Sequence, residues 1–127
     1  MARGLRLFVR PIEATDHPAL QAFFSKQGNA GESGDTTPAW GLLGKLLGDV
    51  VAVVSLDITD DALHVEDLTV ARELRRKWIG RVMMREVEQL AVKMDRRRIV
   101  VEHAGDAQEF LRRVGFQSEG VRWVRDI

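Results

Sequence analysis

The most informative stretch of the chain runs from Leu68 to Arg81 and reads LTVARELRRKWIGR. Its first residues end a run of strand character and its last residues open a helical pattern, so it joins a strand to the N-terminus of a helix. Such a junction leaves several backbone N–H groups without intrahelical partners, at the positive end of the helix dipole. A turn of this kind is suited to binding phosphate.

Cationic side chains gather in the same turn, at Arg75, Arg76, Lys77 and Arg81. A cluster of cations favours a pyrophosphate over a single carboxylate as the ligand. Charge alone leaves a solvated basic turn as an equal alternative.

The segments on both sides of the turn are periodic. Residues 63–70 predict a strand, and residues 79–94 predict an amphipathic helix. The apolar stripe of that helix recurs every three or four residues and consists of Ile79, Met83, Val87, Leu90 and Met94.

Further elements are predicted along the rest of the chain. They are a strand at 5–11, a helix capped by Asp16 and ending at Lys26, a hairpin of 40–43 and 50–57 joined by 44–49, a strand at 99–102, a helix at 107–114 and a final hairpin at 116–126 around Gly120. The almost wholly apolar run 50–57 should be a central strand covered on both faces. Residues 28–38 carry no large apolar side chain and form either a connector or a substrate lid.

The composition is that of one globular domain. The chain has 127 residues, 45% of them apolar and 30% charged. It has no cysteine, which excludes disulfides, thiolate metal sites and cysteine nucleophiles, and no metal is expected. Because no apolar run approaches the roughly 20 residues that cross a bilayer and no signal region opens the chain, we expect a cytoplasmic protein without a membrane partner.

Zero net charge conceals an uneven distribution. Residues 1–65 hold five Lys or Arg against eight Asp or Glu, whereas residues 66–127 hold fourteen against eleven. A polyanionic ligand should therefore meet the second half of the chain.

Three segments together resemble the GCN5-related N-acetyltransferase (GNAT) family. The family's signature for the pyrophosphate of acetyl-coenzyme A is Arg/Gln-x-x-Gly-x-Gly/Ala after a strand that ends in valine, and residues 75–80, RRKWIG, follow Val70. Residues 9–20, VRPIEATDHPAL, look like the family's first strand and helix, and residues 110–116, FLRRVGF, look like its helix that ends at Gly-Phe.

This resemblance implies an α/β (α+β) fold in one domain spanning residues 1–127. The implied architecture is a mixed, mostly antiparallel sheet of six or seven strands, flanked by three or four helices. Within it, the strands at 63–70 and 99–102 run parallel and splay apart, and the cofactor lies in the gap between them.

The resemblance also assigns residues to the cofactor, acetyl-coenzyme A. They are Leu68, Thr69, Val70, Arg75, Arg76, Lys77, Trp78, Ile79, Gly80 and Arg81. In this assignment the backbone N–H of Leu68 or Val70 polarises the acetyl carbonyl. Trp78 stands at the first glycine of the signature, so it must hold an ordinary φ or be strained, and we expect its ring to turn outward to the adenine side or against the core.

Two other positions depart from the family pattern. Many members carry a tyrosine that protonates the departing thiolate, but the matching residue is Leu111 and the chain has no tyrosine. An asparagine common after the fifth strand is matched by Ala104. Because the pKa of a thiol is about 8.5, a general acid helps the transfer without being obligatory.

Transfer to an amine requires the neutral amine, whose free pKa is about 10.4, so a base or a water relay is expected near the end of the strand at 63–70. Glu66 is the first candidate for the catalytic base and His64 the second. These two share a face by the strand's period of two, while Asp67 points the other way unless a bulge intervenes. The alternative is that they are surface polar residues. His103 either contacts substrate or ends its strand.

The leading interpretation is an acetyl-coenzyme A-dependent N-acetyltransferase for the amine of a small molecule or amino acid. Residues 65–70 and 106–111 are similar to the acetyltransferase domain of N-acetylglutamate synthases, which suggests an amino-acid-like acceptor. The alternative is a sensor that binds acetyl-coenzyme A and regulates a protein partner. A short bacterial regulator of aspartate decarboxylase maturation shares the fold, the arginine-rich turn and the missing tyrosine. Balanced charge disfavours a nucleic-acid partner, and a homodimer through the C-terminal strands would be ordinary for the fold.

Overall fold

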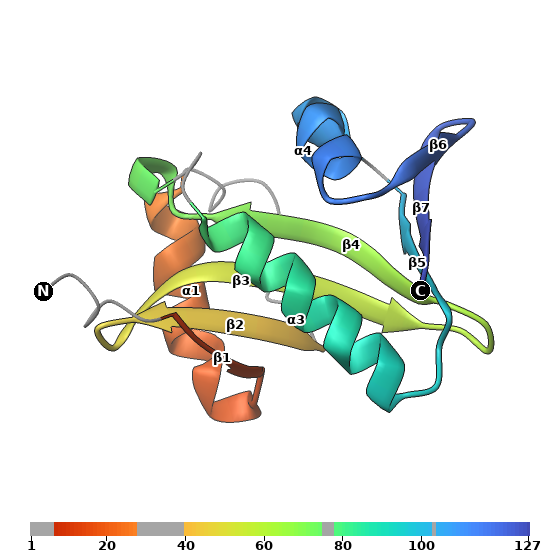
Figure 1. Ribbon diagram of the computed structural model, residues 1–127. Helices are drawn as coiled ribbons and strands as arrows, with labels where there is room; N and C mark the ends of the chain where they lie inside the picture. Colours follow the sequence, from red (N-terminus) through yellow and green to blue (C-terminus); the bar gives the residue numbers. More distant parts are fainter. Residues whose placement is uncertain (1–6, 28–39, 75–77, 103) are drawn as a thin grey trace, which may run out of the picture.

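One mixed sheet organises the molecule (Figure 1). The computed structural model describes residues 7–27, 40–74, 78–102 and 104–127. Within these residues, seven strands lie in the order β1-β2-β3-β4-β5-β7-β6. Their bounds are β1 Phe8–Pro11, β2 Gly41–Leu46, β3 Asp49–Ile58, β4 Leu63–Val70, β5 Arg98–Val101, β6 Gln117–Glu119 and β7 Arg122–Asp126. The described residues form three α-helices beside the sheet: α1 His17–Lys26, α3 Ile79–Lys93 and α4 Gln108–Arg113. The expected mixed, mostly antiparallel sheet is confirmed.

The helices cover opposite faces of the sheet. Figure 1 shows α3 crossing in front of the strands and α1 lying behind them. A Cβ added to Gly44 on β2 would lie 3.0 Å from Met83 Sδ of α3, so Gly44 and its partner Ala52 belong to the α3 face. The alternate residue Val53 of β3 then belongs to the α1 face. Val51 to Val54 are all buried, as expected for a central strand covered on both sides.

The hairpin of β2 and β3 differs from its prediction. Residues 44–49 were expected to form the connection, but β2 continues to Leu46 and the turn is Leu47–Gly48. These two residues have φ values of 53° and 87°, and two consecutive positive φ angles are characteristic of the tight turns that match the twist of a hairpin. Gly44 suggested a break in the sequence, but it is a buried strand residue beneath α3.

Asp16 has the predicted position before α1 but a different contact. Its carboxylate makes no cap bond to the helix. It accepts hydrogen bonds from Arg10 at 2.7 and 2.8 Å and from the backbone N–H of Glu13 at 2.7 Å. The Arg10 guanidinium, followed by the Glu13 N–H, lowers the pKa of Asp16 from 3.8 to about 2. This ion pair ties the start of α1 to strand β1.

The long amphipathic helix is confirmed as α3, which begins at Ile79 as predicted. Its buried side chains are Ile79, Met83, Met84, Val87 and Ala91. The helix ends at Lys93, so Met94 of the predicted stripe follows its last residue. Among the described residues, no helix is long and apolar enough to span a membrane.

The parallel pair β4–β5 separates after a short stretch of pairing. Among the described residues, Leu63 to Val65 of β4 pair with Ile99 to Val101 of β5, where β5 ends. β4 itself continues to Val70, still paired with β3. In Figure 1 the upper part of β4 diverges from β5 and from α4. The splayed parallel pair expected from the family resemblance is therefore present.

Candidate functional site

A bulge in β4 lies where the strand leaves β5. Ser55 of β3 pairs with Asp67 and Leu56 pairs with Val65, so Glu66 is an extra residue without a cross-strand partner. Such an insertion changes the face onto which the following residues point. Asp67 consequently shares the α1 face with Ser55.

The side chain of Glu66 is held on the same face. Ser55 Oγ donates a hydrogen bond to Glu66 Oε1 at 3.1 Å, and the rest of the carboxylate is exposed. Next to it, Thr69 Oγ1 donates to Asp67 Oδ2 at 3.1 Å. The carboxylates of Glu66 and Asp67 thus lie side by side on β4, and each accepts a hydrogen bond from a hydroxyl group.

His64 lies below the bulge, in the part of β4 that still pairs with β5. Its ring contacts partners through both nitrogens: Nδ1 is 3.2 Å from Glu102 Oε2, and Nε2 is 3.2 Å from Thr59 Oγ1. Its cross-strand partner is Asp57, which has the same orientation on β3 as Ser55. His64 and Glu66 therefore share the α1 face, but only Glu66 lies where the two strands have separated.

The described residues at the start of α3 have features that suit an anion. Trp78 occupies the N-cap with no side-chain cap bond, and the first helical turn contains no acidic residue. The amides of that turn have no intrahelical acceptor in an α-helix. Trp78 has a φ of −85°, an ordinary value as the sequence required, and 42% of its surface is exposed. Arg75, Arg76 and Lys77 lie outside the described residues.

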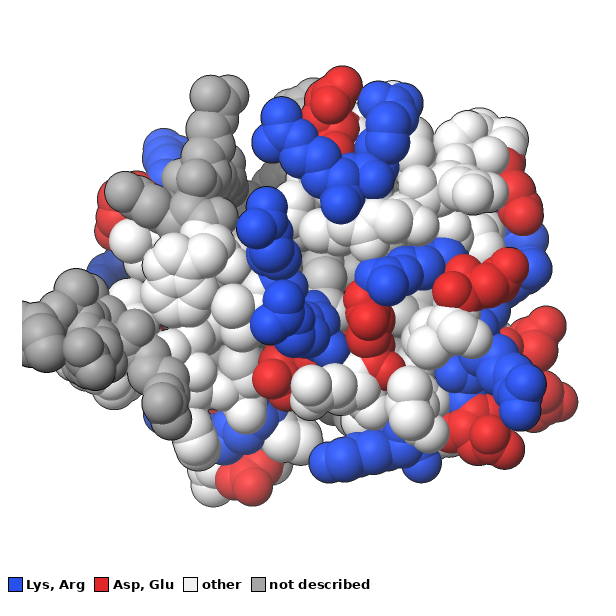
Figure 2. All heavy atoms as spheres, in the orientation of Figure 1, with Lys and Arg blue, Asp and Glu red and all other residues white. Residues whose placement is uncertain are grey.

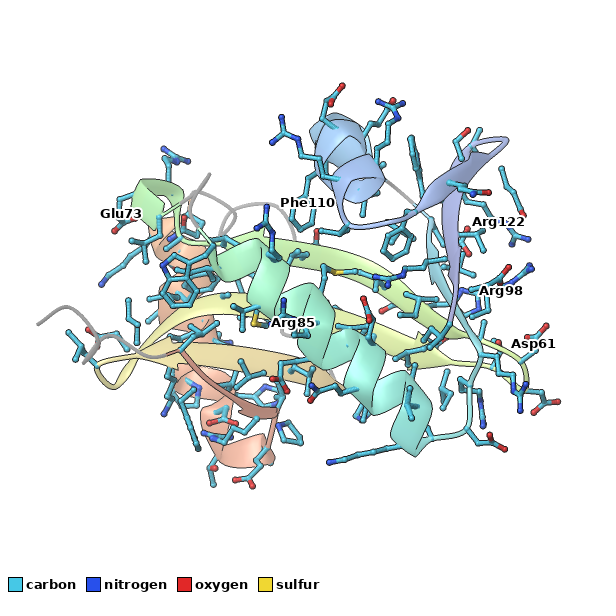
Figure 3. The ribbon with its side chains drawn as sticks, in the orientation of Figure 1. Asp61, Glu73, Arg85, Arg98, Phe110 and Arg122 are labelled. Atoms are coloured by element: carbon cyan, nitrogen blue, oxygen red, sulfur yellow. The ribbon has the colours of Figure 1, made fainter. Side chains whose placement is uncertain are left out.

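Phe110 of α4 projects toward this helix start (Figure 3). A Cβ added to Gly80 would lie 3.4 Å from Phe110 Cζ. Because Gly80 has no side chain, α4 and the first turn of α3 approach closely beside the diverging end of β4. Ile79 is buried beneath the turn, whereas Arg81 is exposed.

Leu111, at the position of the family's tyrosine, is a core residue. Only 3% of its surface is exposed, and it belongs to the main hydrophobic cluster. Ala104 is partly buried against the same cluster, and His103 lies outside the described residues. Within the part of the chain that the structure describes, α4 therefore presents Phe110, and not Leu111, to the start of α3.

Basic side chains surround the α3 side of the site. Figure 2 shows Lys and Arg gathering over the first half of α3 and over α4. Arg81 and Arg85 are one helical turn apart on the exposed side of α3, and Arg113 is exposed on α4. The described residues offer none of these three an ion-pair partner. They also contain no group of three or more His, Asp or Glu side chains that could hold a metal ion.

Two residues of this site were missed from the sequence. Ser55 is a polar residue that interrupts the apolar run 50–56, and such an interruption indicates a side chain with a polar partner. Phe110 has no such signal, because an aromatic residue in a short helix normally indicates core.

Comparisons with known proteins agree with this geometry. The model of the acetyltransferase (GNAT) family matches residues 6–116. The chain is similar in structure to the ribosomal-protein-S18-alanine N-acetyltransferase of Escherichia coli, with a TM-score of 0.76, 14% identity and coverage of 96% of this chain and 94% of that one. It is also similar to the PaiA N-acetyltransferase of Thermoplasma acidophilum in complex with coenzyme A, with a TM-score of 0.76, 12% identity and coverage of 96% and 99%.

A third similar structure is the N-acetylglutamate synthase of Neisseria gonorrhoeae complexed with coenzyme A and N-acetyl-glutamate. Its TM-score is 0.74 at 14% identity, and the match covers 95% of this chain and 35% of that one. No curated protein sequence matches the chain significantly. Identities this low establish a shared fold, whereas the family model covers most of the sequence itself. The chain therefore belongs to the acetyltransferase (GNAT) family.

Proposed function

We propose that the protein is an acetyl-coenzyme A-dependent N-acetyltransferase for the amine of a small molecule, with the whole chain forming one catalytic domain. The observation that carries the proposal is the separation of β4 from β5 after Val65. On one side of the separated strand lies the start of α3, which can take an anion. On the other side lies Glu66, which can take a proton.

The residues around the start of α3 fit the cofactor. Its pyrophosphate needs N–H donors and cations, and the uncapped first turn at Ile79, Gly80 and Arg81 supplies them. Arg75, Arg76, Lys77 and Trp78 complete this proposed pyrophosphate site, while Leu68, Thr69 and Val70 provide the strand along which the acyl arm lies. When bound, acetyl-coenzyme A supplies an acetyl group activated as a thioester.

Glu66 is the proposed catalytic base. An alkylammonium with a pKa of about 10.4 must lose a proton before its nitrogen can attack a carbonyl carbon. The Glu66 carboxylate is exposed and oriented by Ser55, so it can accept that proton directly or through one water. His64 remains the second candidate, although both of its ring nitrogens already have partners within the protein.

The test is acetyl transfer from acetyl-coenzyme A to a panel of primary amines. Glu66→Gln should lower kcat about 10²- to 10⁴-fold while leaving the Kd for coenzyme A unchanged, since general bases contribute factors of this size. The matched control is Asp126→Asn, an exposed carboxylate of β7 paired with Arg98 of β5. Equal rates for Glu66→Gln and the parent protein would place the base elsewhere.

A second candidate function rests on Leu111. A sensor of acetyl-coenzyme A needs no proton donor for a leaving thiolate, and the family's tyrosine position is filled by a buried leucine. Tight binding of acetyl-coenzyme A without turnover on any amine would favour this sensor, with a protein as its partner.

A further inference from the structure

The acidic side chains on the α1 face of the sheet differ in their partners, and Glu102, which follows β5, contacts His64. Those toward β6 and β7 have cationic partners: Asp126 lies 2.9 Å from Arg98, and Glu119 lies 4.0 Å from Arg122. Figure 3 labels both arginines at that end of the molecule. A further group lies on β3 and β4 and consists of Asp57, Glu66 and Asp67, named here the acidic row. Glu66 and Asp67 lie where β4 has separated from β5, and Asp57 lies just below, opposite His64.

No residue of the acidic row forms an ion pair with a described Lys or Arg. All three side chains are exposed. Among the described side chains, the donors to Glu66 and Asp67 are the neutral hydroxyl groups of Ser55 and Thr69. Farther along, Arg72 follows the end of β4, but its guanidinium donates to the backbone carbonyl of Gln27. Within the part of the chain that the structure describes, the acidic row is therefore a group of carboxylates without Lys or Arg partners.

The opposite face of the same strand separation is basic. Arg81, Arg85 and Arg113 are exposed on α3 and α4 without ion pairs to described residues. Around the strand separation, the exposed charges that have no ion pair with a described residue are thus basic on one face of the sheet and acidic on the other. Complementary charge selects and steers ligands, so the basic face suits the polyanionic cofactor and the acidic face suits a cation.

We infer that the acceptor is a small dication: an amine with a second positive charge and no carboxylate. This inference rests on the proposed function, since it specifies the acceptor of the same site. Successive side chains on one face of a strand are about 7 Å apart, so Asp57 lies roughly that far along β3 from Ser55, whose hydroxyl donates a hydrogen bond to Glu66. A four-carbon diamine spans a comparable length, with one amine at Glu66 and the other at Asp57.

An amino-acid acceptor fits this face poorly. The carboxylate of an amino acid would face the acidic row, and like charges at this separation repel. The sequence similarity to N-acetylglutamate synthases suggested such an acceptor. The carboxylates of the acidic row on β3 and β4 instead favour an acceptor without a carboxylate.

Three probes of equal chain length and different charge test the inference: 1,4-diaminobutane, butylamine and 4-aminobutanoate. Equilibrium binding is measured by calorimetry with the protein saturated with coenzyme A, which has no acetyl group to transfer. The diamine should bind at least about tenfold more tightly than butylamine. Its two equivalent amines account for only a factor of two in this preference. The third probe, 4-aminobutanoate, should bind most weakly because its carboxylate is repelled. High salt should reduce the preference.

Asp57→Asn should reduce the preference for the diamine to about the statistical factor of two, because it removes the charge that meets the second amine. It should raise the Kd for the diamine more than the Kd for butylamine, which has no second amine to meet Asp57. Asp126→Asn on the same face should preserve the parent's preference, since its carboxylate is already paired with Arg98. Thermal melts of both variants check that the fold is retained.

The outcomes separate the two proposals. A diamine preference of twofold or less, a preference that survives Asp57→Asn, tight binding of 4-aminobutanoate, or no amine binding at all overturns the inference. Transfer to butylamine without a diamine preference keeps the acetyltransferase function and rejects the dication. Selective diamine binding without acetyl transfer keeps the dication and rejects the enzyme.

Discussion

Replacing Asp16 by asparagine should destabilise the protein at neutral pH. The carboxylate is buried, with 8% of its side chain exposed, and it accepts two hydrogen bonds from Arg10. Its pKa falls from 3.8 to about 2, and each tenfold change in a proton-binding constant corresponds to about 1.4 kcal/mol. The charged form therefore contributes about 2 kcal/mol to the free energy of unfolding. The asparagine oxygen can still accept a hydrogen bond from the Glu13 N–H, so the loss of stability comes mainly from the ion pair with Arg10.

The pH dependence has a definite sign. A carboxyl group with a lowered pKa in the folded state stabilises the fold fully above its unfolded pKa, and this contribution is lost as pH falls through the folded pKa. The difference in unfolding free energy between the parent protein and Asp16→Asn should therefore be about 2 kcal/mol at pH 7. It should shrink as the pH falls from about 4 toward 2.

Urea denaturation at a series of pH values measures this difference. Asp126→Asn is the control, because Asp126 is 71% exposed in its pair with Arg98 and exposed pairs contribute little. If Asp16→Asn and Asp126→Asn had equal effects at pH 7, or if the effect of Asp16→Asn were independent of pH, the assignment of the stability to the Arg10 ion pair would be refuted.

Three further variants test the fold and the proposed site. Gly41→Ala should prevent folding or strongly destabilise the protein, because the added Cβ would lie 2.0 Å from the backbone oxygen of Val54. The measurements are circular dichroism and thermal melting, and a spectrum and melting temperature like those of the parent would contradict the register of β2 and β3. Leu111→Ala should cost about 2–5 kcal/mol in urea denaturation, as expected for truncating a buried leucine, and a cost below about 1 kcal/mol would mean that Leu111 is not a core residue. Replacing Arg76 and Lys77 by glutamate should raise the Kd for coenzyme A while the melting temperature without ligand stays unchanged, and an unchanged Kd would reject the proposed pyrophosphate site.

Much of the fold could be predicted from local patterns. The strand at 63–70 and the start of the helix at Ile79 were predicted correctly, because period-two and period-3.6 patterns arise directly from which side chains must be buried. The β2–β3 turn was predicted wrongly. A glycine in a strand resembles a loop residue in the sequence, and only the packing of Met83 explains why Gly44 has no side chain.

The candidate site was less predictable than the fold. Glu66 and His64 were correctly placed on one face, but the sequence alone could not place Asp67 beside them. A bulge is a property of two paired strands, and it becomes visible only when Ser55 is found opposite Asp67. Likewise, a missing tyrosine is evident in the sequence, whereas the burial of Leu111 and the closeness of Phe110 to Gly80 depend on how α4 packs.

The sequence by itself determined the family, the succession of strands and helices along the chain, and the cationic turn before α3. Each of these can be recognised from residues that lie close together in the sequence. Tertiary structure alone decided which charges face one another across the sheet. Residues 1–65 and 66–127 differ in charge, yet the acidic row draws from both parts, with Asp57 from the first and Glu66 and Asp67 from the second. Pairing of β3 with β4 brings these carboxylates together, and the separation of β4 from β5 leaves them beside the proposed reaction site, away from the arginines that pair with Asp126 and Glu119.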